Sequence, residues 1–150
     1  IKLDKYKKFL ITFYLGPMLL ILYSSLLSYM LFFTICVAPV SNKRLDETNR
    51  TLFLRNIFPK NFTFGLIIAS LAFIFSFIYK NHWSIIISFF ISVGFMINLL
   101  IITPKLNFIS DNKNLTKEIK KKQFRYWHFS SVFLYLIQII LSIVGIYLNI

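Results

Sequence analysis

Four long stretches without a charged residue constrain this chain more than any other feature of its sequence. They cover residues 9–42, 61–79, 81–104 and 126–150. An α-helix needs roughly 20 apolar residues to cross the hydrocarbon core of a bilayer, which is about 30 Å thick. Each stretch is long enough, and the sequence therefore predicts an all-α fold, an integral membrane four-helix bundle. We expect one membrane domain, 1–150, with spans near 17–38, 61–79, 84–103 and 128–148.

Composition agrees with this class of protein. The chain is 57% hydrophobic and only 15% charged, whereas about a quarter of the residues of a soluble domain are charged. The net charge of +12 falls in the gaps between the apolar stretches, as in the loops of membrane proteins. A nucleic-acid-binding module would carry such a charge on a soluble fold, so we expect no nucleic-acid partner.

The distribution of basic residues predicts an orientation. With four spans, both termini and the 80–83 turn share one side and carry five basic residues, whereas the two loops on the other side carry twelve. The side richer in Lys and Arg is normally cytoplasmic. We therefore expect loops 39–60 and 105–127 in the cytoplasm and both termini outside, in a bacterial inner membrane.

The first apolar stretch is longer than one span requires, and it contains Gly16-Pro17. Proline is tolerated in the first turn of a helix but disrupts its interior. The membrane helix is therefore predicted to start near Pro17, with residues 5–15 as an interfacial lead-in.

The basic loop from Ser41 to Lys60 has the pattern of a short amphipathic helix. Ser41 is a candidate N-cap, and Asp46 and Arg50 have the i,i+4 spacing of an ion pair. Pro59 would then restart the chain into the second span. The predicted fold thus includes short interfacial helical segments in the cytoplasmic loops.

Polar and small residues of the last stretch share one face of the predicted helix. Spaced alternately by three and four, they are His128, Ser131, Tyr135, Gln138, Ser142, Gly145 and Asn149. Polar side chains facing acyl chains are costly, so this polar seam should face the bundle interior, with Asn98 as a candidate partner. Spacing alone does not separate two interpretations, namely hydrogen bonding between helices and a polar pocket for a ligand or translocated solute.

The second span carries small residues on one stripe, which predicts close helix packing. They are Gly65, Ala69, Ala72 and Ser76. No Asp, Glu, Lys or Arg lies within any predicted span. Since proton and ion relays usually place carboxylates in the membrane, a carboxylate-driven pump is disfavoured.

His128 is the strongest candidate for a metal or haem ligand, because neutral imidazole is a common ligand. The only other histidine, His82, lies at the opposite membrane face, and Cys36, the single cysteine, lies at the level of His128. Two ligands do not complete a site. A hydrogen-bonded residue at the membrane boundary is the simpler interpretation of His128.

The basic segment 117–125 is a candidate contact for anionic lipid headgroups, and it also serves as a topology anchor. Phosphate-binding glycine loops, nucleophile elbows and paired cysteines are missing from the sequence. We therefore expect a non-enzymatic protein.

Several short motifs, in order, resemble the transmembrane protein 205-like family. The motifs are Val37-Ala38-Pro39, Leu54-Arg55-Asn56-Ile57-Phe58-Pro59, Gly65-Leu66, Asn98, Thr103-Pro104 and Phe124-Arg125-Tyr126-Trp127-His128-Phe129-Ser130-Ser131. The similarity covers about Leu20 to Leu148, although Asn61 stands where an aromatic residue is expected. It implies a four-helix membrane protein of a group largely of unknown function.

More distantly, the chain is similar to membrane proteins of the copper-resistance and haem-biosynthesis type, in which histidines can bind a cofactor. This sequence has no second histidine at the level of His128. The leading interpretation is a bundle whose polar seam serves packing or contact with a small ligand, a membrane partner or a second copy of the chain. The alternatives are a haem- or metal-binding protein using His128 and a small permease or tolerance factor.

Overall fold

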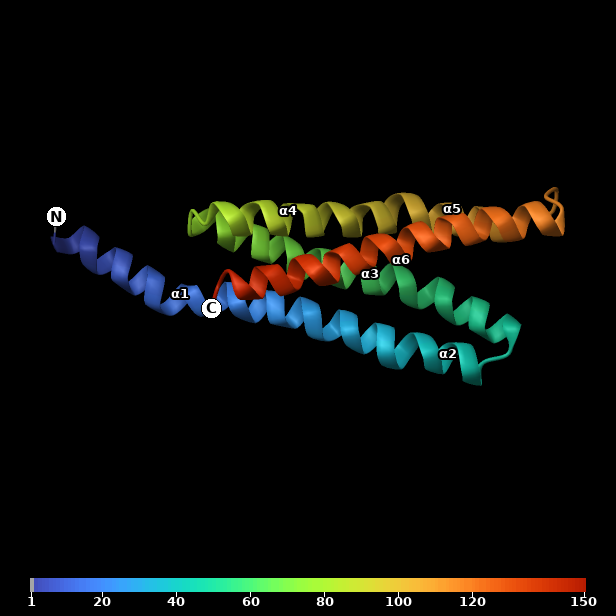
Figure 1. Cartoon of the computed structure of the whole chain (residues 1–150), viewed down its shortest axis with the longest axis horizontal. Coiled ribbons are helices and arrows are strands. Elements are labelled where there is room, and N and C mark those ends of the chain that lie inside the picture. The colour runs from blue at the N-terminus through green and yellow to red at the C-terminus, as the bar shows by residue number, and fades with distance from the viewer. Residues whose placement is uncertain (1) are drawn as a thin grey trace.

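The computed structural model describes residues 2–150, with side chains from Pro17 onward, and this part of the chain is almost entirely helical (Figure 1). Its elements are α1 (Lys2–Phe32), η1 (Phe33–Val37), α2 (Ala38–Arg44), α3 (Glu47–Ile78), α4 (His82–Ile97), η2 (Asn98–Ile102), α5 (Thr103–Asp111) and α6 (Lys117–Tyr147). The two η segments are single π-helical turns that join α1 to α2 and α4 to α5 without a break. Four long helical rods result, and the predicted all-α four-helix fold is confirmed.

The four rods form an up-and-down bundle in which each rod packs against two neighbours. α1 contacts α3 and α6, and α4 also contacts α3 and α6. Figure 1 shows the start of α1, the α3–α4 turn and the C-terminus toward one end, which we call the terminal end. The α2–α3 and α5–α6 connections, residues 45–46 and 112–116, lie at the other end, which we call the basic end.

The surface of the bundle is apolar, as a multi-pass membrane protein requires. All four rods are long and apolar enough to cross a bilayer, and many large hydrophobic side chains point outward. On α6 the exposed rings of Tyr126 and Tyr147 lie about 31 Å apart along the helix at 1.5 Å per residue. Since aromatic side chains collect at both edges of a hydrocarbon layer about 30 Å thick, we expect these two exposed rings to lie near its boundaries.

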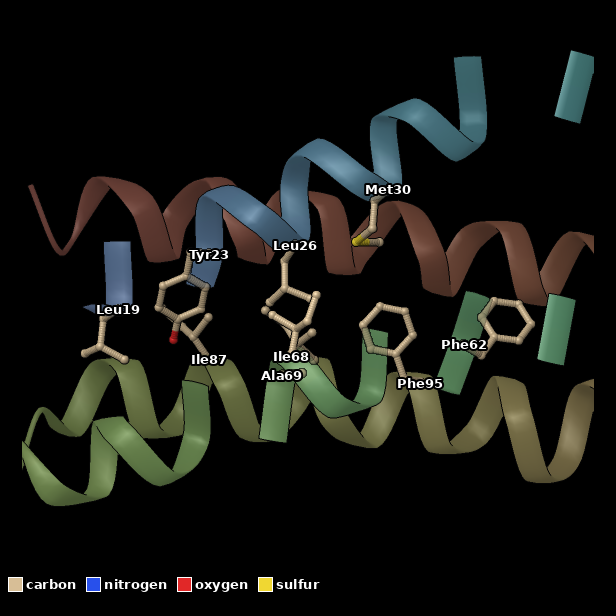
Figure 2. Close-up of a cluster of buried hydrophobic side chains, with 10 residues drawn as sticks. Leu19, Tyr23, Leu26, Met30, Phe62, Ile68, Ala69, Ile87 and Phe95 are labelled. Carbon is tan, nitrogen blue, oxygen red and sulfur yellow. The ribbon is translucent and has the colours of Figure 1, made fainter. Parts of the chain in front are cut away.

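A cluster of buried side chains holds the rods together near the terminal end and the middle (Figure 2). Tyr23, Leu26 and Met30 of α1 point toward Ala69 of α3 and Phe95 of α4 (Figure 2). All five are fully buried. In lipid such contacts stabilise a bundle through close packing, because there is no water for the apolar groups to leave.

The π turns occur directly before Ala38-Pro39 and Thr103-Pro104. In each, the N–H of Ala38 or Thr103 donates to the carbonyl five residues earlier, on Phe33 or Asn98. A proline ring clashes with the carbonyl four residues before it, and a widened turn relieves that clash within a continuous helix. Spans expected to end near residues 38 and 103 therefore continue as helix past both prolines.

Several local predictions are wrong. α1 begins at Lys2 and contains Pro17 in its interior, so the helix does not start at that proline. The side chains of the predicted lead-in, residues 5–15, lie outside the described residues.

The segment 41–60 is helical, but it is not one short interfacial helix. It belongs to α2 and α3, which break at Leu45 and Asp46. Asp46 caps α3 by accepting from the backbone N–H of Asn49 at 3.3 Å instead of pairing with Arg50. Hydrogen bonds from Asn49 hold the pKa of the Asp46 carboxyl below its ordinary value. Pro59 lies inside α3 and does not restart the chain.

Candidate functional site

The polar seam of α6 has two different environments along its length. Gln138, Ser142 and Gly145, toward the terminal end, are buried in close contact with other helices. His128, Ser131 and Tyr135, toward the basic end, line a cavity. One sequence pattern therefore serves both packing and an open site.

In the terminal half, glycines leave room for polar and aromatic side chains of neighbouring helices. The amide of Gln138, which is 1% exposed, donates to the Ile91 carbonyl of α4 at 2.9 Å. A Cβ at Gly94 would lie 2.8 Å from its nitrogen, so the glycine makes room for the amide. In the same way, a Cβ at Gly145 would lie 2.6 Å from the ring of Tyr23.

Asn149 anchors a small hydrogen-bond network at the terminal end. Its amide nitrogen donates to the Ser84 hydroxyl at 2.9 Å, and its oxygen accepts from Asn81 at 3.2 Å. The Tyr23 hydroxyl donates to the backbone carbonyl of Ser84 at 3.0 Å. These bonds join α1, α4 and the end of α6, so this part of the seam serves packing.

In the basic half, the four rods surround a cavity of about 680 Å³. Its apolar wall includes Phe33, Phe58, Phe62, Leu136 and Ile139. Its polar wall comes from every rod and includes Thr34, Ser41, Arg50, Arg55, Asn61, Asn107, His128 and Ser131. The cavity is therefore amphipathic.

The cavity exists because the rods separate toward the basic end. Figure 1 shows the α2–α3 connection well apart from the α5–α6 connection. In the described chain, η1 and α2 do not pack against α5 or α6, whereas α1 does pack against α6. The bundle is consequently open on one side, between η1–α2 and α6.

Only some of the polar side chains that line the cavity form hydrogen bonds with other side chains. The Asn61 amide donates to the Tyr135 hydroxyl at 3.4 Å, and Ser131 donates to the side-chain oxygen of Asn98 at 2.7 Å. The amide nitrogen of Asn98, 0% exposed, has no partner among the described residues. The predicted pairing of the seam with Asn98 thus occurs, through Ser131.

The charged groups of the wall differ in their pairing. Arg55 of α3 forms a two-pronged ion pair with Asp111 of α5, at 2.5 and 3.2 Å. Arg50, one and a half turns earlier on α3, makes no side-chain hydrogen bond or ion pair in the part of the chain described with side chains. Glu47 lies in the first turn of α3, where its charge is favourable to the helix dipole.

His128 lines the cavity, with its ring stacked on Phe124 at a centroid distance of 6.0 Å. Cys36, the suggested second ligand, is exposed and does not line this cavity. In the residues searched, no three His, Cys, Asp or Glu side chains gather as a metal-ligand set. The structure does not bring the two suggested metal ligands together in the cavity.

The small-residue stripe of α3 is buried, and it receives side chains from two neighbours. Gly65, Ala69, Ala72 and Ser76 are all buried. A Cβ at Gly65 would meet the Tyr29 hydroxyl of α1 and the ring of Phe95 of α4.

Several residues of the motifs identified from sequence line the cavity, from α3 and from α6. Its lining includes Leu54, Arg55, Phe58, Phe124, His128 and Ser131, but not Pro39, Pro59 or Pro104. Sequence analysis missed Arg50 and Asn61 as site residues. Asn61 had a usable signal, because it is a polar residue where an aromatic one was expected.

Comparisons with known proteins identify a family but no activity. No curated protein matches the chain, and no solved structure matches it. A family model described as a domain of unknown function, DUF4149, matches residues 21–114. This region holds the cavity residues of η1, α2, α3 and α5 and excludes those of α6. Because the match covers more than half of its length, this multi-pass membrane protein belongs to the DUF4149 family.

Proposed function

We propose that this protein is a non-enzymatic membrane protein that binds a small amphipathic molecule in the cavity of its basic half. The observation that carries the proposal is the contrast along the α6 seam. From Gln138 to Gly145 the seam packs closely against other helices. From His128 to Tyr135 it lines the open cavity.

The physical argument rests on the cost of polar groups at membrane depth. Polar side chains facing a membrane interior are retained where they meet a partner or line an aqueous or ligand-filled space. Typical ligand sites are cavities of about 300–1,000 Å³ with a mainly apolar wall and a few polar groups. The cavity has this size and this mixed lining.

Native mass spectrometry of the protein purified in mild detergent tests the proposal. The unaltered chain should retain a lipid-like adduct. Val132 of α6 lines the cavity, so Val132→Trp should fill the cavity and lose the adduct. Val144→Trp is the matched control, because Val144 is an exposed residue of α6 in the terminal half.

A second filling variant, Thr34→Trp, approaches the cavity from the opposite wall. Melting temperatures close to that of the unaltered protein show that the variants are folded. If both folded filling variants kept the adduct as well as the control does, the proposed binding site would be wrong.

We also propose the orientation predicted by loop charge, with the basic end in the cytoplasm of a bacterial cell and both termini outside. The twelve basic residues of that end support it. Relatedness to the transmembrane protein 205-like proteins is a further proposal, supported by the order and spacing of the motifs.

Single-cysteine labelling tests the orientation. In a Cys36→Ser background, Asn114→Cys reports on the basic end and Lys80→Cys on the α3–α4 turn. A membrane-impermeant maleimide added to intact spheroplasts should label position 80 and not position 114. The reverse pattern would invert the proposed topology.

A further inference from the structure

We propose that the occupant of the cavity is an anionic phospholipid from the surrounding leaflet, with its phosphate near Arg50 and one acyl chain in the apolar depth. This inference rests on the proposed function and specifies the ligand of the same site.

The cavity extends across the boundary between headgroups and hydrocarbon. Its α6 wall runs from Phe124 to Ile139, about 22 Å of helix. Tyr126, which we expect at the membrane boundary, lies near the start of this wall. The occupant must therefore present a polar group at one end and an apolar chain over most of the length.

The opening of the cavity favours a ligand that is already in the bilayer. The bundle is open between η1–α2 and α6, which do not pack together in the described chain. On the η1–α2 side the cavity is lined by Phe33 and Thr34 of η1 and by residues of α2. A lipid of the adjacent leaflet can insert a chain here without leaving the membrane.

The charged side chains around the cavity favour a ligand with an anionic headgroup. Arg55 is already neutralised by Asp111, whereas Arg50 has no ionic partner among the described side chains. Glu47 also lines the cavity, but it stands at the positive end of the α3 dipole. The basic end as a whole has twelve basic and four acidic residues, a net charge of +8. An unpaired guanidinium beside a lipid layer is a strong partner for a phosphate.

The test titrates the detergent-purified full chain with lipids of identical acyl chains and detects adducts by native mass spectrometry. We expect phosphatidylglycerol to bind about fivefold more tightly than phosphatidylethanolamine, the free-energy difference expected from one basic residue near an anionic lipid. Arg50→Gln should abolish this preference. Lys43→Gln is the control, because it removes an equal charge at the same end and Lys43 does not line the cavity.

The outcomes separate this inference from the proposed function. If both lipids bound equally and Val132→Trp abolished both, the cavity would be a lipid site without charge selection, and the inference would be overturned. It would also be overturned if Lys43→Gln weakened phosphatidylglycerol binding as much as Arg50→Gln, which indicates diffuse surface attraction.

Three further outcomes would also decide against a phospholipid held by Arg50 or against the cavity itself. Binding of oleate but not phosphatidylglycerol would replace the phospholipid by a fatty acid and overturn the inference. Equal loss of phosphatidylethanolamine in Glu47→Gln and Arg50→Gln would identify a zwitterionic headgroup instead. Lipid binding that is insensitive to Val132→Trp and Thr34→Trp would contradict the proposed function itself.

Discussion

The terminal and basic halves of the bundle consist of the same four rods, yet one half is closed and the other open. Gly65, Gly94 and Gly145 lie at close helix contacts toward the terminal end and the middle. Toward the basic end three rods carry a proline, at positions 39, 59 and 104, whereas toward the terminal end only α1 does so, at Pro17. Missing Cβ atoms let helices approach, whereas proline bends or widens a helix.

This difference shows that an apolar, membrane-spanning sequence does not by itself specify a solid bundle. Polar residues have opposite roles in the two halves. Gln138 fills the space beside a glycine and is buried, whereas Arg50 faces a cavity and has no ionic partner among the side chains from Pro17 onward. Substitutions should therefore be costly for stability in the terminal half and for binding in the basic half.

The largest loss of stability is expected when a glycine at a close helix contact in the terminal half is replaced by a larger residue. Gly145→Leu places a side chain where the rigid, fully buried ring of Tyr23 lies. We expect a loss of about 3 kcal/mol in unfolding free energy, the upper part of the usual range for overpacking. Thermal unfolding in detergent measures it.

The matched control for that substitution is Ala38→Leu in the basic half. Ala38 lines the cavity, so the larger side chain can extend into open space, and the melting temperature should change little. Equal destabilisation by the two variants would contradict the division of the bundle into a closed and an open half.

A smaller difference in unfolding free energy is expected between two substitutions that each remove a polar group from the seam. Gln138→Leu removes the hydrogen bond to the Ile91 carbonyl, and interhelical bonds of this kind contribute about 0.6–1.7 kcal/mol in membranes. Tyr135→Phe removes only a long contact with Asn61 at 3.4 Å, so its loss should be smaller. Chemical unfolding in mixed micelles compares them, and a greater loss for Tyr135→Phe would reverse the assignment of roles.

The sequence predicts the bundle because apolar length is a local property that each span carries by itself. It also predicts the α6 seam, because a face of a helix follows directly from residue spacing. It could not divide that seam between packing and cavity. The division depends on the neighbours, namely on Gly94 beside Gln138 and on the absence of α2 beside His128.

The prolines show the same limit. Pro39 and Pro104 directly follow the predicted spans 17–38 and 84–103, and proline disfavours a helix interior. In the structure a π turn before each lets the helix continue. Pro17 and Pro59, however, lie inside α1 and α3 without a π turn, so the presence of a proline does not by itself predict the local geometry. Arg50 was assigned to an ion pair for a similar reason, since i,i+4 spacing does not reveal that Asp46 caps α3 instead.

The smallest effect is expected at the ion pair between Arg55 and Asp111, which connects α3 and α5 at the basic end. The side chains are 32% and 63% exposed, so water and salt screen them, and such pairs contribute about 0.2–1 kcal/mol. A double-mutant cycle with Arg55→Gln and Asp111→Asn should give a coupling in this range at low salt. At about 1 M salt, where charges are screened within roughly 3 Å, the coupling should vanish. A coupling that persisted in high salt would mean that the basic end is closed around the pair and excludes water. The two halves of the bundle would then differ less in openness than their packing indicates.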